Sequence, residues 1–127
     1  MPPFLIENPG LNSGFMIAQY TAASLVSKNK ILCHPASVDS IESSNGQEDH
    51  VSMGSIAGVK LVEVVQNIYS ILGIELMTAS QAMEFRRPRK SSLELENIHT
   101  EFRKYVPYLS EDVVLHDLMV KSEKFIS

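Results

Sequence analysis

One long apolar segment restricts how this chain can fold. From Gln47 to Arg86 the sequence has no proline, and apolar side chains recur at every helical spacing. The interruptions form a narrow polar stripe of Lys60, Glu63, Asn67 and Ser70. This pattern predicts one helix over residues 47–86, buried on several sides. About forty residues at 1.5 Å each would span roughly 60 Å, whereas a compact domain of this length has a radius of gyration of about 14 Å. We therefore expect the helix either to bend or to be covered by other chains.

Shorter helices are predicted on both sides of this segment. Apolar residues at helical spacing, preceded by polar capping residues, predict helices over about residues 12–30, 92–105 and 111–125. Pro35, in "CHPASVDS", marks a connector, and Pro107 ends the helix that precedes it. No stretch alternates between polar and apolar residues as a strand would. We therefore predict an all-α chain, a single helical unit over residues 1–127 that belongs to a long-helix bundle.

Composition excludes several classes of protein. A hydrophobic content of 44% is that of a folded chain, and a net charge of -4 argues against general nucleic-acid binding, which needs a basic surface. The single cysteine, Cys33, cannot form an internal disulfide, which is typical of a reducing compartment. The opening "MPPFLIENPG" resembles a loop more than a signal peptide. Lys60, Glu63 and Glu75 interrupt the apolar segment and disfavour a membrane span. We therefore predict a cytoplasmic chain with no nucleic-acid or membrane partner.

Directly before the apolar segment, the stretch "SSNGQEDHVSMGS" gathers an amide, two acids and a histidine. Ser44 and Gln47 stand at capping-box spacing, and Asn45 and Glu48 repeat that spacing one residue later. Glu48 and Asp49 would then lie in the first helical turn, where negative charge is favoured by about 0.3–1 kcal/mol. From spacing alone, the acids are predicted to start the helix.

The histidines form no metal pattern. His50 beside two acids is a weak ligand set with too few soft donors, and His34, His99 and His116 share no spacing with it. The sequence also has no Ser-His-Asp signature, phosphate loop or zinc pair. We therefore predict no metal site.

The segment "RRPRKSS", residues 86–92, carries four basic residues in five positions. Such a run could contact an anion. Its commoner meaning is a solvated helix end that complements the helix macrodipole. The sequence leaves both interpretations open.

Three motifs occur in a specific order: "NSGFMIAQ", "HPASVDS" and "QEDHVSMG". With "ILGIELMTASQAMEFRRP" after them, they resemble the C-terminal part of histidine ammonia-lyases over essentially the whole chain. The resemblance implies an all-helical fold in which long helices from four subunits pack into a central bundle. It therefore implies that the partners of this chain are the upstream lyase portion and other subunits of a homo-oligomer.

The resemblance also implies an activity. The family removes the α-amino group of L-histidine without hydrolysis and releases urocanate and ammonia, a reaction of histidine catabolism. Its electrophile is a methylidene-imidazolone ring formed from an internal Ala-Ser-Gly. Here the three Ala-Ser pairs are followed by Leu25, Val38 and Gln81. The resemblance thus implies a fragment that has no cofactor-binding residue, is inactive by itself and binds L-histidine only in a completed site.

In the family, the glutamate of "QEDH" faces the substrate, and it corresponds here to Glu48. A carboxylate suits an imidazole ring because it accepts a hydrogen bond from the ring N–H and favours the charged form. The resemblance makes Glu48 the catalytic and substrate-binding residue and Gln47 a weaker candidate for a contact near the prosthetic ring. Asp49 and His50 are expected to make structural hydrogen bonds. Many relatives have the motif "SANQEDH", whereas this chain has Asn45-Gly46 before Gln47. Because Gly46 removes a side chain beside the site, the orientation of Glu48 stays open.

Two alternatives stay open. The chain could be a non-catalytic helical assembly or interaction module, in which Glu48 is only a leftover helix cap. A phenylalanine or tyrosine lyase parent is a further option. It is disfavoured because the residue corresponding to Glu48 looks like an amide in phenylalanine lyases.

Overall fold

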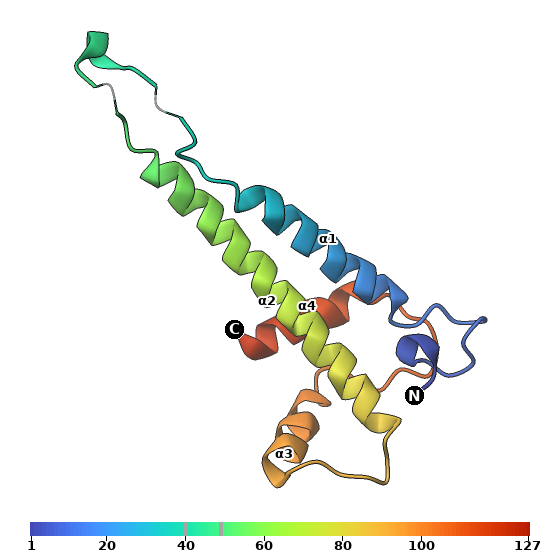
Figure 1. The fold of residues 1–127 in the computed structure, drawn as a ribbon. Coiled ribbons are helices and arrows are strands. Elements are labelled where there is room, and N and C mark those ends of the chain that lie inside the picture. The colour runs from blue at the N-terminus through green and yellow to red at the C-terminus, as the bar shows by residue number, and fades with distance from the viewer. Residues whose placement is uncertain (40, 49) are drawn as a thin grey trace.

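The chain is all-α, as predicted. A computed structural model describes residues 1–39, 41–48 and 50–127 (Figure 1). Within these residues the structure contains no strand, only two isolated β-bridges. In chain order, the elements are the 3-10 helix η1 (Pro3–Leu5), α1 (Met16–Leu32), the 3-10 helix η2 (Ser44–Gly46), α2 (Gly54–Glu84), α3 (Leu93–Phe102) and α4 (His116–Ile126).

The two longest helices, α1 and α2, lie side by side and run in opposite directions (Figure 1). Their connection, residues 33–53, extends beyond the end of the helix pair as a long loop. α4 crosses α2 and packs against it, and α3 lies beside the C-terminal part of α2, where His99 contacts Glu84. The helix pair therefore carries the loop at one end, α4 across the middle of α2, and α3 and the N-terminal segment toward the other end.

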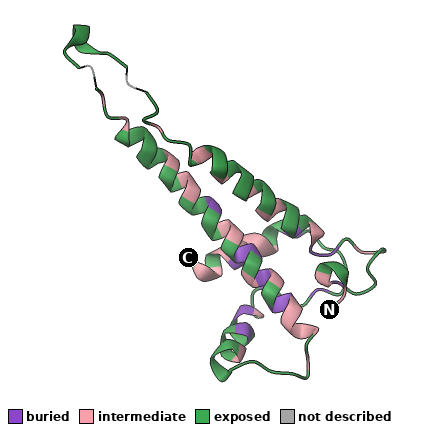
Figure 2. Cartoon of the chain, in the orientation of Figure 1, coloured by how far each residue is buried: buried purple, intermediate pink, exposed green. Residues whose placement is uncertain are grey.

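The buried core lies at the end of the helix pair that is far from the loop (Figure 2). Its apolar members are Ile6, Phe15, Ala18, Ile74, Met77, Phe102, Val106, Leu109 and Leu115. A fully buried amide, Gln81, joins three segments within it. Its nitrogen donates to the carbonyl oxygens of Leu5 (3.1 Å) and Leu109 (2.7 Å), and its oxygen accepts from the Leu109 N–H (3.3 Å). Because an unpaired buried amide is costly, these bonds hold the N-terminal segment and the Leu109 segment against α2.

The polar stripe of α2 faces other parts of the chain. Each of its residues bonds to a group on α1, on the loop or on α4. The pairs are Lys60 with the His34 carbonyl oxygen, Glu63 with Lys28 (2.5 Å), Asn67 with Asn29 (2.7 Å) and Ser70 with Glu123 (2.6 Å). The exposed ion pair contributes little to stability, whereas the buried Asn67 side chain needs its partner. The stripe therefore aligns α1 with α2 and sets where the loop begins.

As a consequence, apolar side chains of α1 and α2 point outward (Figure 2). On α2 the exposed set includes Val59, Leu61, Val62, Val65, Ile68 and Leu72. By length and composition alone α2 could cross a membrane, with a mean hydropathy of 1.2 in a window of which only 17% is buried. The core helix of a soluble protein can meet the same criteria of length and composition. The chain by itself leaves this surface uncovered.

The long helix is shorter than predicted. It begins at Gly54 rather than near Gln47, and it ends at Glu84 rather than at Arg86. Its start is displaced because residues 43–48 close a backbone turn on themselves. Its 31 residues run without a break and span roughly 47 Å. The segment therefore forms one continuous helix, without an interruption at which the chain folds back.

The first and last helices also begin later than predicted, at Met16 and His116. The Asp112 carboxylate accepts the backbone N–H groups of Ser13 and Gly14, each at 2.7 Å. These bonds join the segment before α1 to the segment before α4. Both segments are held in contact with each other and so do not continue their helices.

The helix predicted over residues 92–105 is α3, Leu93–Phe102. Ser92 is its N-cap, and its side-chain oxygen accepts from the Leu95 N–H at 3.4 Å. The helix ends before Tyr105 because the Tyr105 N–H bonds to the Phe102 carbonyl oxygen, 3.0 Å away, and so closes a turn.

Candidate functional site

The candidate residues Gln47 and Glu48 lie on the loop that projects beyond α1 and α2 (Figure 1). Ser43 and Glu48 form an antiparallel bridge. The Ser43 N–H donates to the Glu48 carbonyl oxygen at 2.9 Å, and the Glu48 N–H donates back to the Ser43 carbonyl oxygen at 3.2 Å. Between them, the Gln47 N–H donates to the Ser44 carbonyl oxygen at 3.3 Å. The backbone that carries both candidates is therefore bonded within the loop.

The turn between the bridged residues uses left-handed backbone. Ser44, Asn45 and Gly46 have φ angles of 53°, 56° and 83°. Asparagine tolerates this region better than most residues, and glycine adopts it without steric cost. A Cβ atom at Gly46 would also stand 3.0 Å from a Glu42 carboxylate oxygen. The Asn45-Gly46 pair thus suits the turn that presents Glu48.

The interpretation of Glu48 as part of a helix start is wrong. α2 begins at Gly54, well after Glu48, and its N-cap residue Met53 makes no side-chain cap hydrogen bond. Neither capping-box pair forms, because its members lie in the turn. Asp49 lies outside the described residues, and His50 is exposed and belongs to no helix.

The site offers a carboxylate and an amide to its surroundings. Gln47 and Glu48 are exposed, and neither side chain has a hydrogen-bond or ion-pair partner within residues 1–39, 41–48 and 50–127. A carboxylate can accept hydrogen bonds and stabilise a neighbouring positive charge. Acid–base or nucleophilic catalysis needs further groups around the substrate, and no metal-binding cluster of His, Cys, Asp or Glu occurs among the residues that the structure describes. The loop can therefore contribute to a site but cannot form one alone.

Sequence reasoning did not identify the residues that position this loop. Lys60 Nζ donates to the carbonyl oxygen of His34 and fastens the start of the loop to α2. Asn67 bonds to Asn29 and fixes α1 beside α2. The only sequence signal for these roles was the polar stripe on an otherwise apolar helix.

Comparison with known proteins identifies the family. Residues 1–104 match the family model described as aromatic amino acid lyase. This chain belongs to the aromatic amino acid lyase family. The resemblance drawn from its motifs is thereby confirmed at the level of the family.

Relatives of this chain include histidine ammonia-lyases. It is 60% identical over 116 residues to that of Caldanaerobacter subterraneus subsp. tengcongensis (91% of this chain, 23% of the relative). It is 50% identical over 127 residues to that of Treponema denticola (100% of this chain, 25% of the relative). The crystal structure of histidine ammonia-lyase from Trypanosoma cruzi matches with a TM-score of 0.94 and 45% identity, over 99% of this chain and 25% of that one. This chain thus spans about a quarter of the length of the relatives it matches.

Proposed function

We propose that this chain is the C-terminal part of a histidine ammonia-lyase, which converts L-histidine to urocanate and ammonia without hydrolysis. The observation that carries the proposal is the exposed Glu48 carboxylate on the projecting loop, in a chain that is 50–60% identical to histidine ammonia-lyases. The rest of the active site would come from the other three quarters of the lyase.

Glu48 is proposed to recognise the imidazole ring of the substrate. Its carboxylate can accept a hydrogen bond from a ring N–H, and its charge favours the protonated ring. Its present lack of a partner among the described residues supports this role, because a donor can reach it without displacing an internal contact. Gln47, the neighbouring exposed amide, is proposed to lie at the edge of the same site.

The prosthetic group of the family belongs to another part of the protein. A methylidene-imidazolone ring requires Ala-Ser-Gly, and the Ala-Ser pairs of this chain are followed by Leu25, Val38 and Gln81. The residues present therefore do not fit the group, and this chain is proposed to be inactive by itself. Its own contribution is limited to binding and orienting the substrate through Glu48.

The exposed apolar sides of α1 and α2 are proposed to be covered by the rest of the lyase and by further subunits. Contiguous exposed apolar surfaces on a protein in water commonly mark interaction sites. Protein is the proposed cover because the Lys28–Glu63 ion pair between the two helices is half-exposed, and contact of these charges with lipid would be costly.

We expect the isolated chain to associate through these apolar surfaces. Light scattering at micromolar concentration should give the mass of an oligomer of the 14.1 kDa chain. A compact monomer would contradict the proposed assembly, because it would show that the uncovered helices need no partner.

Complementation tests the proposed activity. The chain would be produced together with the N-terminal three quarters of the Treponema denticola relative, which is 50% identical to it over all 127 residues. Urocanate formation from L-histidine, followed by ultraviolet absorbance, is expected only from the mixture.

The second candidate function is a helical assembly module without catalytic role, favoured by the large uncovered surface of α2. Under that alternative, the two parts would form a stable, helical complex that produces no urocanate. Such a result would reject the lyase proposal and leave the assembly role.

A further inference from the structure

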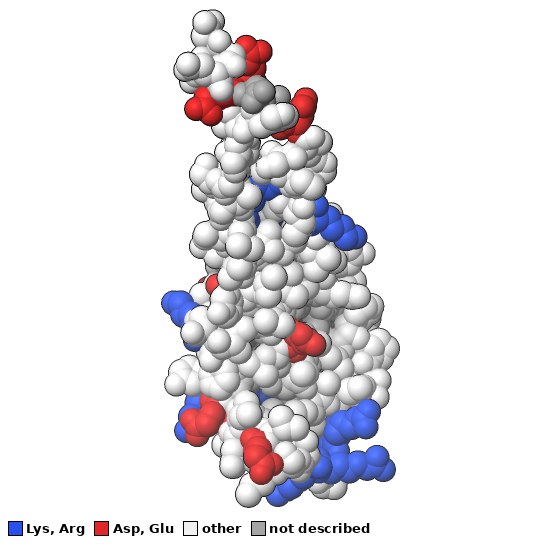
Figure 3. Space-filling view, turned by 60° about the vertical axis from the view of Figure 1, so that its left-hand side comes forward, with Lys and Arg blue, Asp and Glu red and all other residues white. Residues whose placement is uncertain are grey.

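Four basic residues follow α2, and they differ in the ion pairs that they form. Arg87 is paired: its Nη1 lies 2.7 Å from a Glu96 carboxylate oxygen, and its Nε lies 3.6 Å from Glu84. Arg86, Arg89 and Lys90 are exposed and have no ion pair or side-chain hydrogen bond within the described residues. Figure 3 shows a group of Lys and Arg side chains at the lower end of the molecule, with some Asp and Glu side chains near them, far from the acidic loop at the upper end. Three positive charges at this end are therefore uncompensated.

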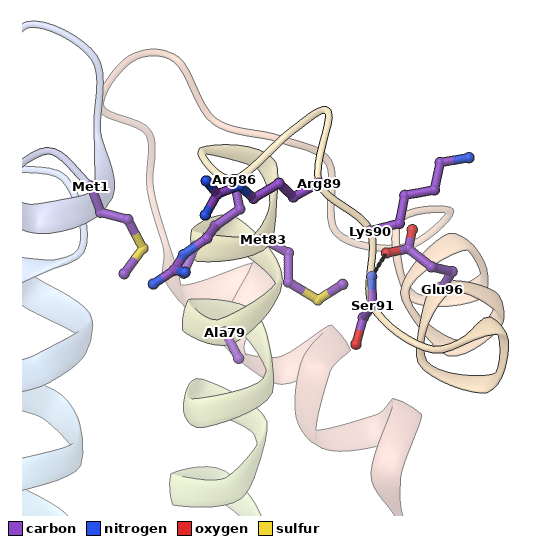
Figure 4. A pocket seen from close by; sticks show the side chains of 9 residues that line it. Met1, Ala79, Met83, Arg86, Arg89, Lys90, Ser91 and Glu96 are labelled. Carbon is purple, nitrogen blue, oxygen red and sulfur yellow. Dashed lines mark hydrogen bonds between the residues drawn. The ribbon is translucent and has the colours of Figure 1, made fainter.

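A backbone turn brings two of these charges together. The Arg89 N–H donates to the Arg86 carbonyl oxygen at 3.0 Å, and a turn of this kind holds the two Cα atoms within about 7 Å. In Figure 4 the side chains of Arg86 and Arg89 extend toward Met1, whereas Lys90 points away. Two guanidinium groups that repel each other without a counter-charge form a suitable place for an anion.

These arginines line a pocket together with apolar side chains (Figure 4). The cavity has a volume of about 480 Å³. Its lining combines α2 residues (Ala79, Ala82, Met83) with Met1 on one side and with Arg86, Arg89, Lys90, Ser91 and Glu96 of the segment after α2 and of α3. The pocket thus combines positively charged with apolar lining residues.

The one acid in this lining does not neutralise the arginines. One Glu96 oxygen accepts the Ser91 N–H at 2.8 Å, and the other accepts from Arg87. The Ser91 bond and the Arg87 bond hold the pKa of Glu96 below its usual value, so the group is ionised and already paired. The charges of Arg86 and Arg89 remain available.

We propose that this pocket binds a small organic oxyanion. The phosphate or carboxylate group of the ligand is held by the guanidinium groups of Arg86 and Arg89, whose planar donors match such oxygens in pairs. The apolar part of the ligand lies against Met83 and the alanines of α2. This assigns to "RRPRKSS" the anion-contacting role that its sequence left open, and it does not depend on the lyase activity.

Calorimetric titration of the 127-residue chain tests the proposal. The probes are phenyl phosphate, benzoate, inorganic phosphate and uncharged benzyl alcohol. We expect saturable binding of phenyl phosphate or benzoate that is tighter than that of inorganic phosphate or of the alcohol. The relative affinity of the first two identifies the preferred oxyanion. Met83→Gln should reduce the advantage of the aromatic anions over inorganic phosphate.

The double variant Arg86→Gln/Arg89→Gln should weaken binding at least about tenfold, since it removes hydrogen bonds from charged donors. The matched control Lys30→Gln/Lys121→Gln removes the same charge from positions outside the pocket and should leave the affinity within about twofold. Circular dichroism checks the fold. If the double variant loses helix, the single variant Arg89→Gln, in the exposed turn, is titrated instead, and it should also weaken binding.

Three results would overturn the proposal. They are no saturable binding of either aromatic anion, equal binding by the arginine double variant, and loss of binding once the chain is assembled with the rest of a lyase. The last result would show that another polypeptide segment fills the pocket in the complete protein.

Discussion

Replacing Glu48 by alanine is expected to lower urocanate formation by the complemented lyase roughly 10- to 100-fold. The carboxylate on the projecting loop is proposed to accept a hydrogen bond from the substrate imidazole, and a hydrogen bond to a charged group contributes about 1.5–3 kcal/mol. A factor of ten in rate corresponds to about 1.4 kcal/mol. The measurement is kcat/KM for L-histidine, by ultraviolet absorbance, at equal concentrations of assembled protein.

Two further variants separate the role of Glu48 from that of the loop. Glu42→Ala removes an exposed acid from the same loop and should keep kcat/KM within about twofold. Glu48→Gln keeps a hydrogen-bond acceptor but loses the charge, and it should fall between the wild type and Glu48→Ala. Equal activity of wild type and Glu48→Ala, or an equal loss in Glu42→Ala, would show that the Glu48 carboxylate does not contact the substrate.

Replacing Gly73 by alanine is expected to separate α4 from α2 and to destabilise the chain. The added Cβ would lie 2.8 Å from the Glu123 nitrogen, 3.0 Å from the Glu123 Cα and 3.1 Å from the Ser122 carbonyl carbon. These are backbone atoms, so relief requires a shift of the whole helix α4. Overpacking of this kind costs about 1–3 kcal/mol. Urea unfolding followed by circular dichroism measures the loss.

A second glycine of the same helix provides the control. Gly58 is exposed, and a Cβ there would meet no atom within 4 Å. Both substitutions gain the roughly 1 kcal/mol by which alanine exceeds glycine in a helix. The difference between Gly58→Ala and Gly73→Ala therefore reports the α2–α4 contact alone, and Gly73→Ala should be less stable by about 1–3 kcal/mol. Equal urea midpoints would show that α4 does not pack closely at Gly73.

Much of the candidate site could be predicted from sequence, although not its backbone. The motif "QEDH" singled out Gln47 and Glu48, and the structure places both on one exposed loop. Their spacing to Ser44 and Asn45 predicted helix caps. That prediction was wrong because Ser43 and Glu48 form backbone hydrogen bonds with each other, which compete with helix formation. The spacing of capping residues contains no information about such a competing turn.

The sequence by itself determined the helical class, the long uninterrupted helix and the family, because helical periodicity and ordered motifs are local properties of the chain. Only the tertiary structure decided which side of α2 is covered. The polar stripe from Lys60 to Ser70 has the spacing of an ordinary solvent-facing side, yet it faces α1, the loop and α4. The apolar sides stay exposed because too little of the chain remains to cover them. Which side is buried depends on partners distant in sequence, and periodicity contains no information about them.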